Sequence, residues 1–412
     1  MRKHISIDEL SVGMKVVKLD KSWAETPFLR HRMRVTAVQQ IDALRACGVR
    51  VLDVETDEAE IRPEPGPAPV PPLAQPPFPS EPVAKELAGR ETIPETSFDE
   101  ELPAARQVYS AAKRVIGQAM LDVRMGRDIN METVNQVVSD MADSVLRNPD
   151  ALTSLSRLKR FDEYTFFHSV NTSLLGLALG RSVGFDRDTL HRLGVGTLLH
   201  DIGKTRIPLE ILNKPGRFEA NEFEIMQQHV MRGVEILSGT TGLAEPYLKP
   251  TLEHHERVDG TGYPNGKKKA DLSEFGLIAS IVDIYDAITS DRCYHKAKPP
   301  HEALQFIYQL AQRGHVDSAF LQRFVQVVGV YPVGSIVGLQ TGETAVVCQI
   351  NHQQPLEPRV CIVKTSGNTL LASPEFVDLA DQVRRPRRII HTVLSPDTAG
   401  VNPADCLDKE AP

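Results

Sequence analysis

Residues 193–204 read LGVGTLLHDIGK and place two potential metal ligands at the end of an apolar segment. The leucines of this stretch and of the residues just before it predict a helix over 188–201. His200 and Asp201 end that helix, and the glycine that follows allows the backbone to turn tightly. Lys204 then stands beside the two ligands, where its ammonium group can hold an anionic oxygen. The stretch predicts a helical domain that carries a histidine and aspartate site.

A second pair of adjacent ligand residues, His254 and His255, begins the stretch 254–264, which reads HHERVDGTGYP. Consecutive histidines point in different directions on a helix, so one cleft that holds a pair of metal ions is the economical use of both. His168 and His229 each have apolar neighbours. A lone histidine in that setting is more often a packed core residue, but the two adjacent pairs in the same helical block favour the ligand role.

The residue types at these positions limit both the metal and the reaction. Neutral imidazole and carboxylate suit iron, manganese, zinc or nickel, and the lack of cysteine in the motifs disfavours a structural zinc site. Two divalent ions bridged by an aspartate can activate water at neutral pH and polarise a phosphoryl oxygen. A lysine beside them can neutralise the charge that develops in the transition state. The pattern therefore indicates phosphoester hydrolysis.

The composition of the 412-residue chain, with 41% hydrophobic and 25% charged residues, is typical of a globular protein with two or three domains. Its formal net charge of -7 argues against binding to a nucleic-acid polymer or an anionic membrane. The five cysteines are scattered without CxxC spacing, as in a reducing cytosol. The most apolar run, 174–179, is too short to cross a bilayer, and the N-terminus lacks a signal-peptide pattern. We expect a cytoplasmic protein without membrane insertion.

Five segments follow one another along the chain. Strand patterns at 14–19 and 49–54, with a helix between them, predict a small α+β domain. A proline-rich linker, a long helical block and a set of short valine-rich runs come next. The expected fold class is mainly α, a helical bundle with a small N-terminal α+β domain and a small C-terminal β module. The expected boundaries are 1–60 for the accessory domain, 61–103 for the linker, 104–330 for the bundle, 331–385 for the β module and 386–412 for a surface tail.

The basic run at 384–388 is more often a solvated face than a nucleic-acid site. Within the helical block and the β module, periodicity predicts individual elements. The expected helices are 162–180, 188–201, 219–238, 272–291, 301–313 and 316–328, besides stripes at 108–119 and 134–145, and the expected strands are 336–339, 345–350 and 360–363.

The order of the motifs resembles the HD phosphohydrolase superfamily, and more closely its HD-GYP subgroup of cyclic di-GMP phosphodiesterases. The similar stretches are HDIGK at 200–204, HHERVDGTGYP at 254–264, VDIYDAITSDR at 282–292 and YPVGSIV at 331–337. The resemblance covers residues 104–380, and residues 1–60 resemble a small accessory domain often found ahead of HD-GYP domains. It implies an HD-type helical bundle that opens cyclic di-GMP to the linear dinucleotide pGpG and often continues to GMP.

The resemblance also implies residue roles. The metal ligands would be His168, His200, Asp201, His229, His254, His255 and Asp283. Asp201 would bridge two divalent ions, iron or manganese, with nickel and zinc as further options. Asp201 and Lys204 would be the catalytic residues, Lys204 and Arg292 would contact the phosphates, and Tyr263 would lie in a loop beside the substrate. Asp259 and Asp286 are expected to hold their loops.

Two departures from the family pattern carry expectations. Members with a third metal have a glutamate four residues before the first histidine; here that position is Tyr164, and Glu163 is rotated by about 100° on the helix. We therefore expect two metal ions. The usual Arg-Pro-Tyr-Arg reads RCYH at 292–295, so one phosphate contact is absent or moves to Lys296. This departure affects the second cleavage, from pGpG to GMP, more than the first.

Three functions compete. An active cyclic di-GMP phosphodiesterase, which lowers the second messenger and so affects biofilm formation and motility, is favoured because no ligand is missing from the motifs. The first alternative is a non-catalytic cyclic di-GMP receptor that signals through residues 1–60. The second is an HD hydrolase of another nucleotide, such as an alarmone or cyclic GMP-AMP. A protein partner at residues 1–60 and a homodimer are both compatible with the sequence.

Overall fold

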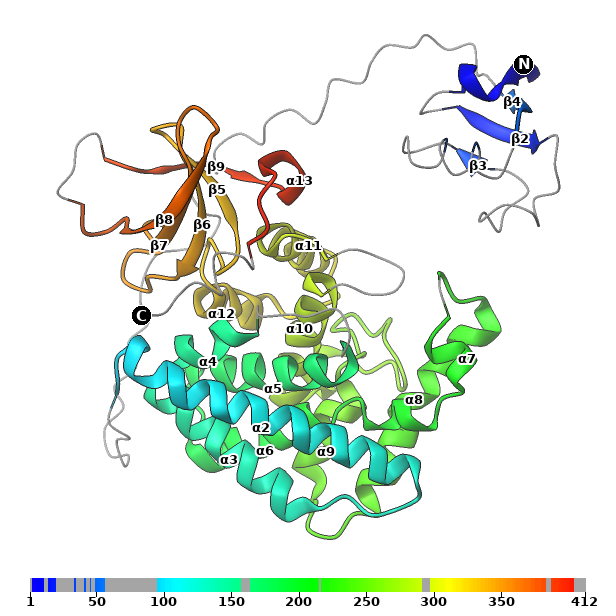
Figure 1. Cartoon of the computed structure of the whole chain (residues 1–412). Coiled ribbons are helices and arrows are strands. Elements are labelled where there is room, and N and C mark those ends of the chain that lie inside the picture. The colour runs from blue at the N-terminus through cyan, green and yellow to red at the C-terminus, as the bar shows by residue number, and fades with distance from the viewer. Residues whose placement is uncertain are drawn as a thin grey trace. The chain divides into compact units, whose positions relative to one another are not determined.

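The computed structural model divides the chain into two compact units, Met1–Pro71 and Pro72–Pro412 (Figure 1). Most of the linker expected at 61–103 lies outside the residues that the structure describes. Those residues are 2–10, 14–19, 33–34, 41, 45, 49–55, 95–156, 164–214, 216–290, 297–382 and 387–403.

The N-terminal unit contains a four-stranded antiparallel sheet in the order β1-β4-β2-β3. Its strands are β1 (Arg2–Ser6), β2 (Lys15–Leu19), β3 (Met33–Arg34) and β4 (Val51–Glu55). Strands β2 and β4 confirm the strands predicted at 14–19 and 49–54, and Val16 and Leu52 are buried in the core of the unit. The helix predicted between them lies almost wholly outside the described residues. β1 escaped prediction because it is an edge strand, which tolerates charged residues and needs little apolar alternation.

The helical bundle begins at α2 (Phe98–Arg124), earlier than the expected boundary at 104. Ser97 caps this helix: its hydroxyl accepts from the backbone N–H of Glu100, whose carboxylate accepts from the backbone N–H of Ser97. Pro103 lies in the second turn, where it removes only one intrahelical hydrogen bond. The capping box therefore fixes the start of the bundle, and the proline does not.

Most helices of the bundle match their predicted positions, but the short helices α4 (Pro149–Leu155) and α7 (Leu209–Leu212) were missed, and so was α9 (Glu245–Glu253). Pro246 and Pro250 both lie within it, so its sequence reads as a loop. The remaining helices are α3 (Met131–Arg147), α4 (Pro149–Leu155), α5 (Tyr164–Ser182), α6 (Arg187–Leu198), η3 (Ile202–Arg206), α7 (Leu209–Leu212), α8 (Ala220–Ser238), α9 (Glu245–Glu253), η4 (Lys269–Asp271), α10 (Glu274–Thr289), α11 (Pro300–Gln312), α12 (Ser318–Val328) and α13 (Pro396–Ala399).

Two central helices, α5 and α10, hold the bundle together. Residues 167–180 of α5 are buried on every face of the helix, and residues 276–283 of α10 are buried likewise. Neighbouring helices cover both on several sides, so that polar residues such as Asn171 are buried in them as well as apolar ones. Among the described residues, no helix has both the length and the apolar character needed to cross a membrane.

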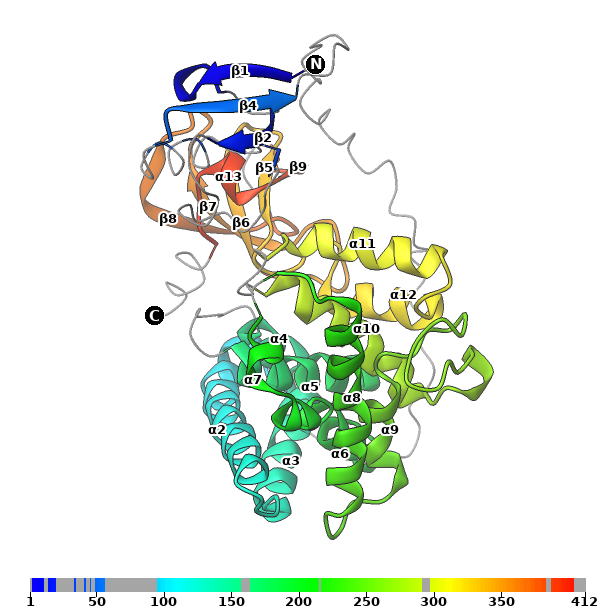
Figure 2. The same ribbon diagram turned by 90° about the vertical axis from the view of Figure 1, so that its right-hand side faces the viewer.

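The C-terminal module is a five-stranded antiparallel sheet in the order β8-β7-β6-β5-β9. Figure 2 shows α11 and α12 on the side of the bundle that is nearest to this sheet. Strands β5, β6 and β7 confirm the three strands predicted for this module. The strands are β5 (Ile336–Leu339), β6 (Thr344–Gln349), β7 (Arg359–Lys364), β8 (Leu370–Asp378) and β9 (Ile390–Leu394).

The expected tail at 386–412 is wrong over its first part, because β9 pairs with β5 and belongs to the sheet. This strand was not predicted because the basic residues ahead of it indicated an exposed surface segment. Arg388 is buried, and its guanidinium binds the carboxylates of Glu343 at 2.7 Å and Glu375 at 3.0 Å. Two carboxylates neutralise the arginine, so a residue that reads as surface charge lies within the module.

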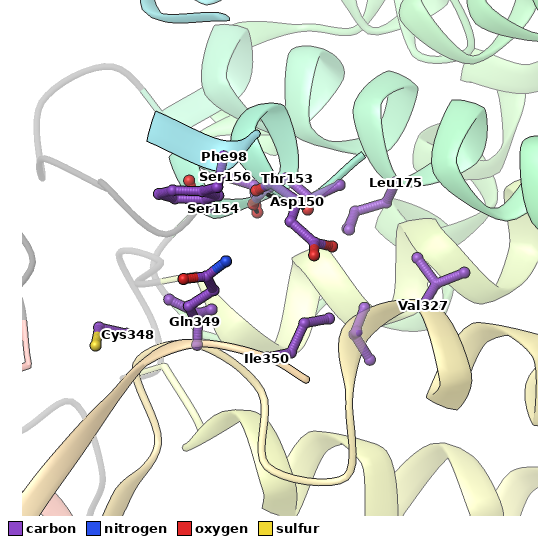
Figure 3. A pocket seen from close by; sticks show the side chains of 12 residues that line it. Phe98, Asp150, Thr153, Ser154, Ser156, Leu175, Val327, Cys348, Gln349 and Ile350 are labelled. Carbon is purple, nitrogen blue, oxygen red and sulfur yellow. Dashed lines mark hydrogen bonds between the residues drawn. The ribbon is translucent and has the colours of Figure 1, made fainter. Parts of the chain in front are cut away.

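A pocket lies at the seam between the bundle and the β module (Figure 3). Phe98, Leu175 and Val327 line it from helices, and Ile350 lines it from the end of β6. At this seam, Nε2 of His352 lies 3.0 Å from a carboxylate oxygen of Asp150 in α4. None of the predicted metal ligands lines the pocket, so it lies apart from the chemistry that the motifs predict.

Candidate metal centre

Five helices bring the seven predicted ligands to one place. Three overlapping triads have ligand atoms within 4.8 Å of one another: His168 with His200 and Asp283, His200 with Asp201 and His254, and His229 with His254 and His255. His255 is half-buried and the other six side chains are buried. By element, His168 lies in α5, His200 and Asp201 follow α6, His229 lies in α8, His254 and His255 follow α9, and Asp283 lies in α10.

Asp201 stands between two groups of histidines. Its Oδ2 atom lies 3.3 Å from Nε2 of His200 and 3.5 Å from Nε2 of His168. Its Oδ1 atom lies 3.5 Å from Nε2 of His229 and 3.8 Å from Nε2 of His254. Each carboxylate oxygen therefore faces its own pair of imidazoles, and a cation on either side of Asp201 would have ligands of both kinds.

Hydrogen bonds on the far side of three rings fix which nitrogen faces the centre. A carbonyl oxygen only accepts, so each Nδ1 must carry the hydrogen, which leaves the Nε2 lone pair for the centre. This is the outer-shell arrangement that orients metal-binding imidazoles. The Nδ1 atoms donate from His200 to Thr197 at 2.7 Å, from His229 to Met226 at 2.6 Å and from His254 to Pro250 at 2.9 Å.

The surroundings of the centre keep most imidazoles neutral and the carboxylates charged. Burial is the main cause that lowers the pKa of His229 to about 4 and the pKa of His254 to about 3. Burial alone would raise the pKa of Asp201, but the nearby positive charge, that of Lys204 foremost, outweighs burial and holds that pKa well below its usual value. These are the protonation states that metal ligands require.

His168 differs from the other histidines of the centre. Burial lowers its pKa, but hydrogen bonds to Asp283 and Asp286 outweigh burial and raise it to about 8. Its Nε2 atom lies 3.0 Å from an oxygen of Asp283. A cation between these two atoms would replace the proton, because a ligating imidazole must be neutral.

The residues present fit a metal ion. Among the described residues, Nε2 of His200 and Oδ1 of Asp201 are buried and have no hydrogen-bond partner. A buried polar atom without a partner destabilises a fold unless something satisfies it. A nitrogen lone pair and a carboxylate oxygen are both ligand atoms for divalent cations, so cations on either side of Asp201 would satisfy them.

Comparison with known proteins decides the family. Residues 136–320 match the HD domain, residues 2–134 a domain of unknown function (DUF3391), and residues 336–399 a KOW domain associated with the HD domain. A cyclic di-GMP phosphodiesterase of Pseudomonas aeruginosa is 33% identical over 380 residues, which cover 92% of this chain and 89% of that protein. The chain belongs to the HD-GYP phosphodiesterase family.

Other members of the family and one solved structure show more local or weaker likeness. A 3'3'-cGAMP-specific phosphodiesterase of Vibrio cholerae is 44% identical over 97 residues, which cover 23% of this chain and 19% of that protein. A solved HDG"Y"P protein from Bdellovibrio bacteriovorus has a TM-score of 0.47 and 15% identity, and the match covers 79% of this chain and 98% of that one. HD-domain phosphohydrolases depend on metal ions, and the histidine and aspartate clusters of this phosphodiesterase could bind them.

Asp286 supports the centre of this phosphodiesterase from one helical turn beyond Asp283. Its Oδ2 atom accepts from Nδ1 of His168 at 2.8 Å, and its Oδ1 atom accepts from the amide of Asn171 at 2.9 Å. The hydroxyl of Tyr109 in turn donates to Asn171 at 3.0 Å. Sequence reasoning gave Asp286 a loop-holding role and missed the other two residues. A polar side chain one turn after His168, on the same face of the helix, was the signal that could have found Asn171.

The contact between Asp286 and His168 leads to a prediction. We expect Asp286→Ala to lower metal affinity and turnover roughly 10- to 100-fold, because an unheld imidazole loses its orientation. Asp286→Asn should retain most of both, since its amide oxygen can still accept from Nδ1 of His168. Bound metal and hydrolysis rate, measured on the same samples, check this. Equal loss in both variants would show that the charge of Asp286 matters rather than its hydrogen bond.

Two glutamates missed by sequence reasoning flank His254 and His255 and hold the loop that contains Tyr263. Glu256 accepts from the backbone N–H of Asn265 at 2.7 Å. Glu253 is buried and accepts from the backbone N–H of Ser273 at 2.9 Å. The loop also packs backbone against backbone, because a Cβ on Gly262 would lie only 2.4 Å from the backbone nitrogen of Arg257. These contacts therefore join the predicted ligands His254 and His255 to the loop.

The predicted substrate contacts are described only in part. The ammonium group of Lys204 forms an ion pair with Asp201, so the lysine lies at the centre as expected. The ring of Tyr263 stacks on His255, with 4.7 Å between ring centroids. Arg292 and Lys296 lie outside the described residues. Glu163 and the side chain of Tyr164 do as well, so the expectation of two metal ions remains a prediction.

Proposed function

We propose that this phosphodiesterase hydrolyses cyclic di-GMP to pGpG at a pair of divalent metal ions held by the seven ligands. The observation that carries the proposal is the position of Asp201, whose two oxygens face two different pairs of histidines. Asp283 completes the His168 side and His255 completes the His229 side. Identity along most of the chain to a cyclic di-GMP phosphodiesterase supports the substrate.

The residues of the chain divide the work of hydrolysis. Bound divalent ions would supply an activated water and would neutralise phosphoryl charge. Asp201 fixes the spacing of the two ion sites, and the outer-shell carbonyls keep the imidazoles directed at them. Lys204 is placed to contact a phosphate oxygen as charge develops there. Arg292 is proposed as a second phosphate contact from the sequence motif.

The number of metal ions bears on the product. Tyr164 occupies the position where a third ion would need a carboxylate, and a phenol ionises only at a pKa of about 10. We therefore propose two ions, iron or manganese, with efficient ring opening and slow cleavage of pGpG. Purified protein should convert cyclic di-GMP to pGpG that accumulates, with about two ions per chain by elemental analysis. Binding without turnover in the metal-loaded protein would indicate a receptor instead.

A second substrate follows from the local likeness to a 3'3'-cGAMP-specific phosphodiesterase. That likeness spans 23% of this chain, whereas likeness to the cyclic di-GMP enzyme spans 92%. Cyclic di-GMP is therefore the favoured substrate. Parallel assays with both cyclic dinucleotides measure the ratio of their kcat/KM values, and a ratio that favours cyclic GMP-AMP would reverse the choice.

Deleting residues 1–85 tests the proposed boundary between the accessory domain and the catalytic block. We expect a soluble protein that still binds metal, because the compact unit ahead of the bundle ends at Pro71 and α2 begins at Phe98. The match to the domain of unknown function extends through α2, so a second deletion through residue 130 is the contrast. The protein with this longer deletion should fail to fold, because α2 contributes Tyr109 and Ile116 to the main core. Aggregation or metal loss in the shorter deletion would show that the accessory domain supports the catalytic block.

A further inference from the structure

A column of aromatic rings runs outward from the metal centre. The ring of His255 lies 5.1 Å from that of His229, centroid to centroid. Tyr263 stacks on His255 at 4.7 Å with 30° between the planes, and Phe223 meets Tyr263 at 6.1 Å and 82°. The column therefore leads from two predicted metal ligands to Phe223, a residue to which sequence reasoning gave no role.

Phe223 is the solvent-exposed end of this column. Its side chain is 44% exposed, although it lies in α8, the helix that carries His229. Among the described residues, Phe306 in α11 is the other exposed phenylalanine, at 40%. A single exposed apolar side chain is ordinary on a protein surface, but this one contacts Tyr263, whose ring stacks on a predicted metal ligand, and aromatic side chains next to polar groups line ligand sites.

The position of Phe223 suits a group attached to a phosphate at the metal centre. It lies six residues before His229 in α8, which is about 9 Å along the helix axis. In a nucleotide the base is separated from its phosphate by the sugar, which is a distance of the same order. The near-perpendicular contact with Tyr263 leaves at least one face of the Phe223 ring without contact to that tyrosine.

We propose that Phe223 determines substrate affinity by stacking on one guanine base of the cyclic dinucleotide. This inference rests on the proposed function, since it supplies the base contact for the same site. Every nucleobase has a π-face, so an aromatic side chain binds it without a matching set of hydrogen bonds. The metal ligands and Lys204 would hold the phosphate, and Phe223 would hold the base.

The test separates recognition of the base from recognition of the phosphate. In the metal-loaded full chain, Phe223→Ala should raise KM for cyclic di-GMP roughly tenfold, with kcat within about twofold. Phe223→Trp should keep KM near the wild-type value, and Phe306→Ala should leave both constants unchanged. As a competitive inhibitor, GMP should have a roughly tenfold higher inhibition constant with Phe223→Ala than with the wild type. Inorganic phosphate should inhibit both proteins equally well.

A spectroscopic readout reports the contact directly. The fluorescence of 2-aminopurine riboside monophosphate should be quenched on binding to the wild-type protein and to Phe223→Trp, and much less by Phe223→Ala. Equal weakening of GMP and phosphate in Phe223→Ala, or unchanged inhibition by GMP, would overturn the stacking role. Lack of cyclic di-GMP turnover in the wild-type protein would instead refute the proposed function, and the fluorescence result, which needs no turnover, would still decide whether Phe223 contacts a base.

Discussion

Asp201→Ala is expected to abolish hydrolysis of cyclic di-GMP and to release the metal pair. Each oxygen of Asp201 faces its own pair of imidazoles, so alanine removes a ligand from both ion sites at once. Loss of several kcal/mol of transition-state stabilisation lowers turnover by at least about a thousandfold. No other ligand of the centre has this position between the two histidine pairs in the described part of the chain.

The fold should survive that substitution. Asp201 is a buried charge, and its removal leaves the helices that frame it with their own apolar core. Elemental analysis, activity and far-ultraviolet circular dichroism on one preparation measure metal, turnover and helix content together. Asp271→Ala, at an exposed aspartate in η4, is the matched control and should behave as the wild type. Near-normal turnover in Asp201→Ala would remove the basis of the site assignment.

The two adjacent pairs of candidate ligands could be predicted from the sequence because each pair lies in a local motif, whereas the roles proposed for His168 and His229 rested on the adjacent pairs and on the family resemblance. His200-Asp201 ends an apolar helix and His254-His255 precedes a glycine-rich loop, so spacing and residue type were sufficient. The outer shell could not be predicted in the same way. Asp286 binds His168 from a position 118 residues away, and Tyr109 binds Asn171 across 62 residues. Such contacts depend on the packing of α2, α5 and α10, which no local pattern specifies.

The fold was predicted where periodicity was strong and missed where local residues contradicted it. α5 and α10 are buried on most sides, and their apolar runs gave their positions nearly to the residue. α9 forms despite two prolines because Pro246 lies in the first turn, where proline is tolerated, and packing against neighbouring helices outweighs the local preference of Pro250. β9 forms behind a basic run because Glu343 neutralises Arg388. In both cases tertiary contacts reversed what the local sequence indicated.

Gly203→Ala is expected to destabilise the protein and to disrupt the metal centre from outside the ligand set. A Cβ at this position would lie 1.9 Å from the carbonyl oxygen of His229 and 2.5 Å from the backbone nitrogen of Gly233. Both are backbone atoms of α8, so no side chain can move aside to relieve the overlap. The sequence suggested that this glycine serves a tight turn, but its φ is not positive, and close approach is what requires it.

The consequence for the centre follows from which elements the overlap would separate. η3 follows Asp201 and contains Lys204, and α8 contains His229, whose Nε2 lies 3.5 Å from Asp201. Overpacking here should reduce stability by about 3 kcal/mol, which lowers the Tm by roughly 6–12 °C, and bound metal should fall with it. Gly239→Ala, at the end of α8, is the matched control, because its Cβ would meet no atom closer than 3.6 Å and its backbone is helical. If Gly203→Ala kept the Tm of the wild type and its full metal content, η3 and α8 could separate without loss of stability. The backbone contact at Gly203 would then not be what holds Asp201 next to His229.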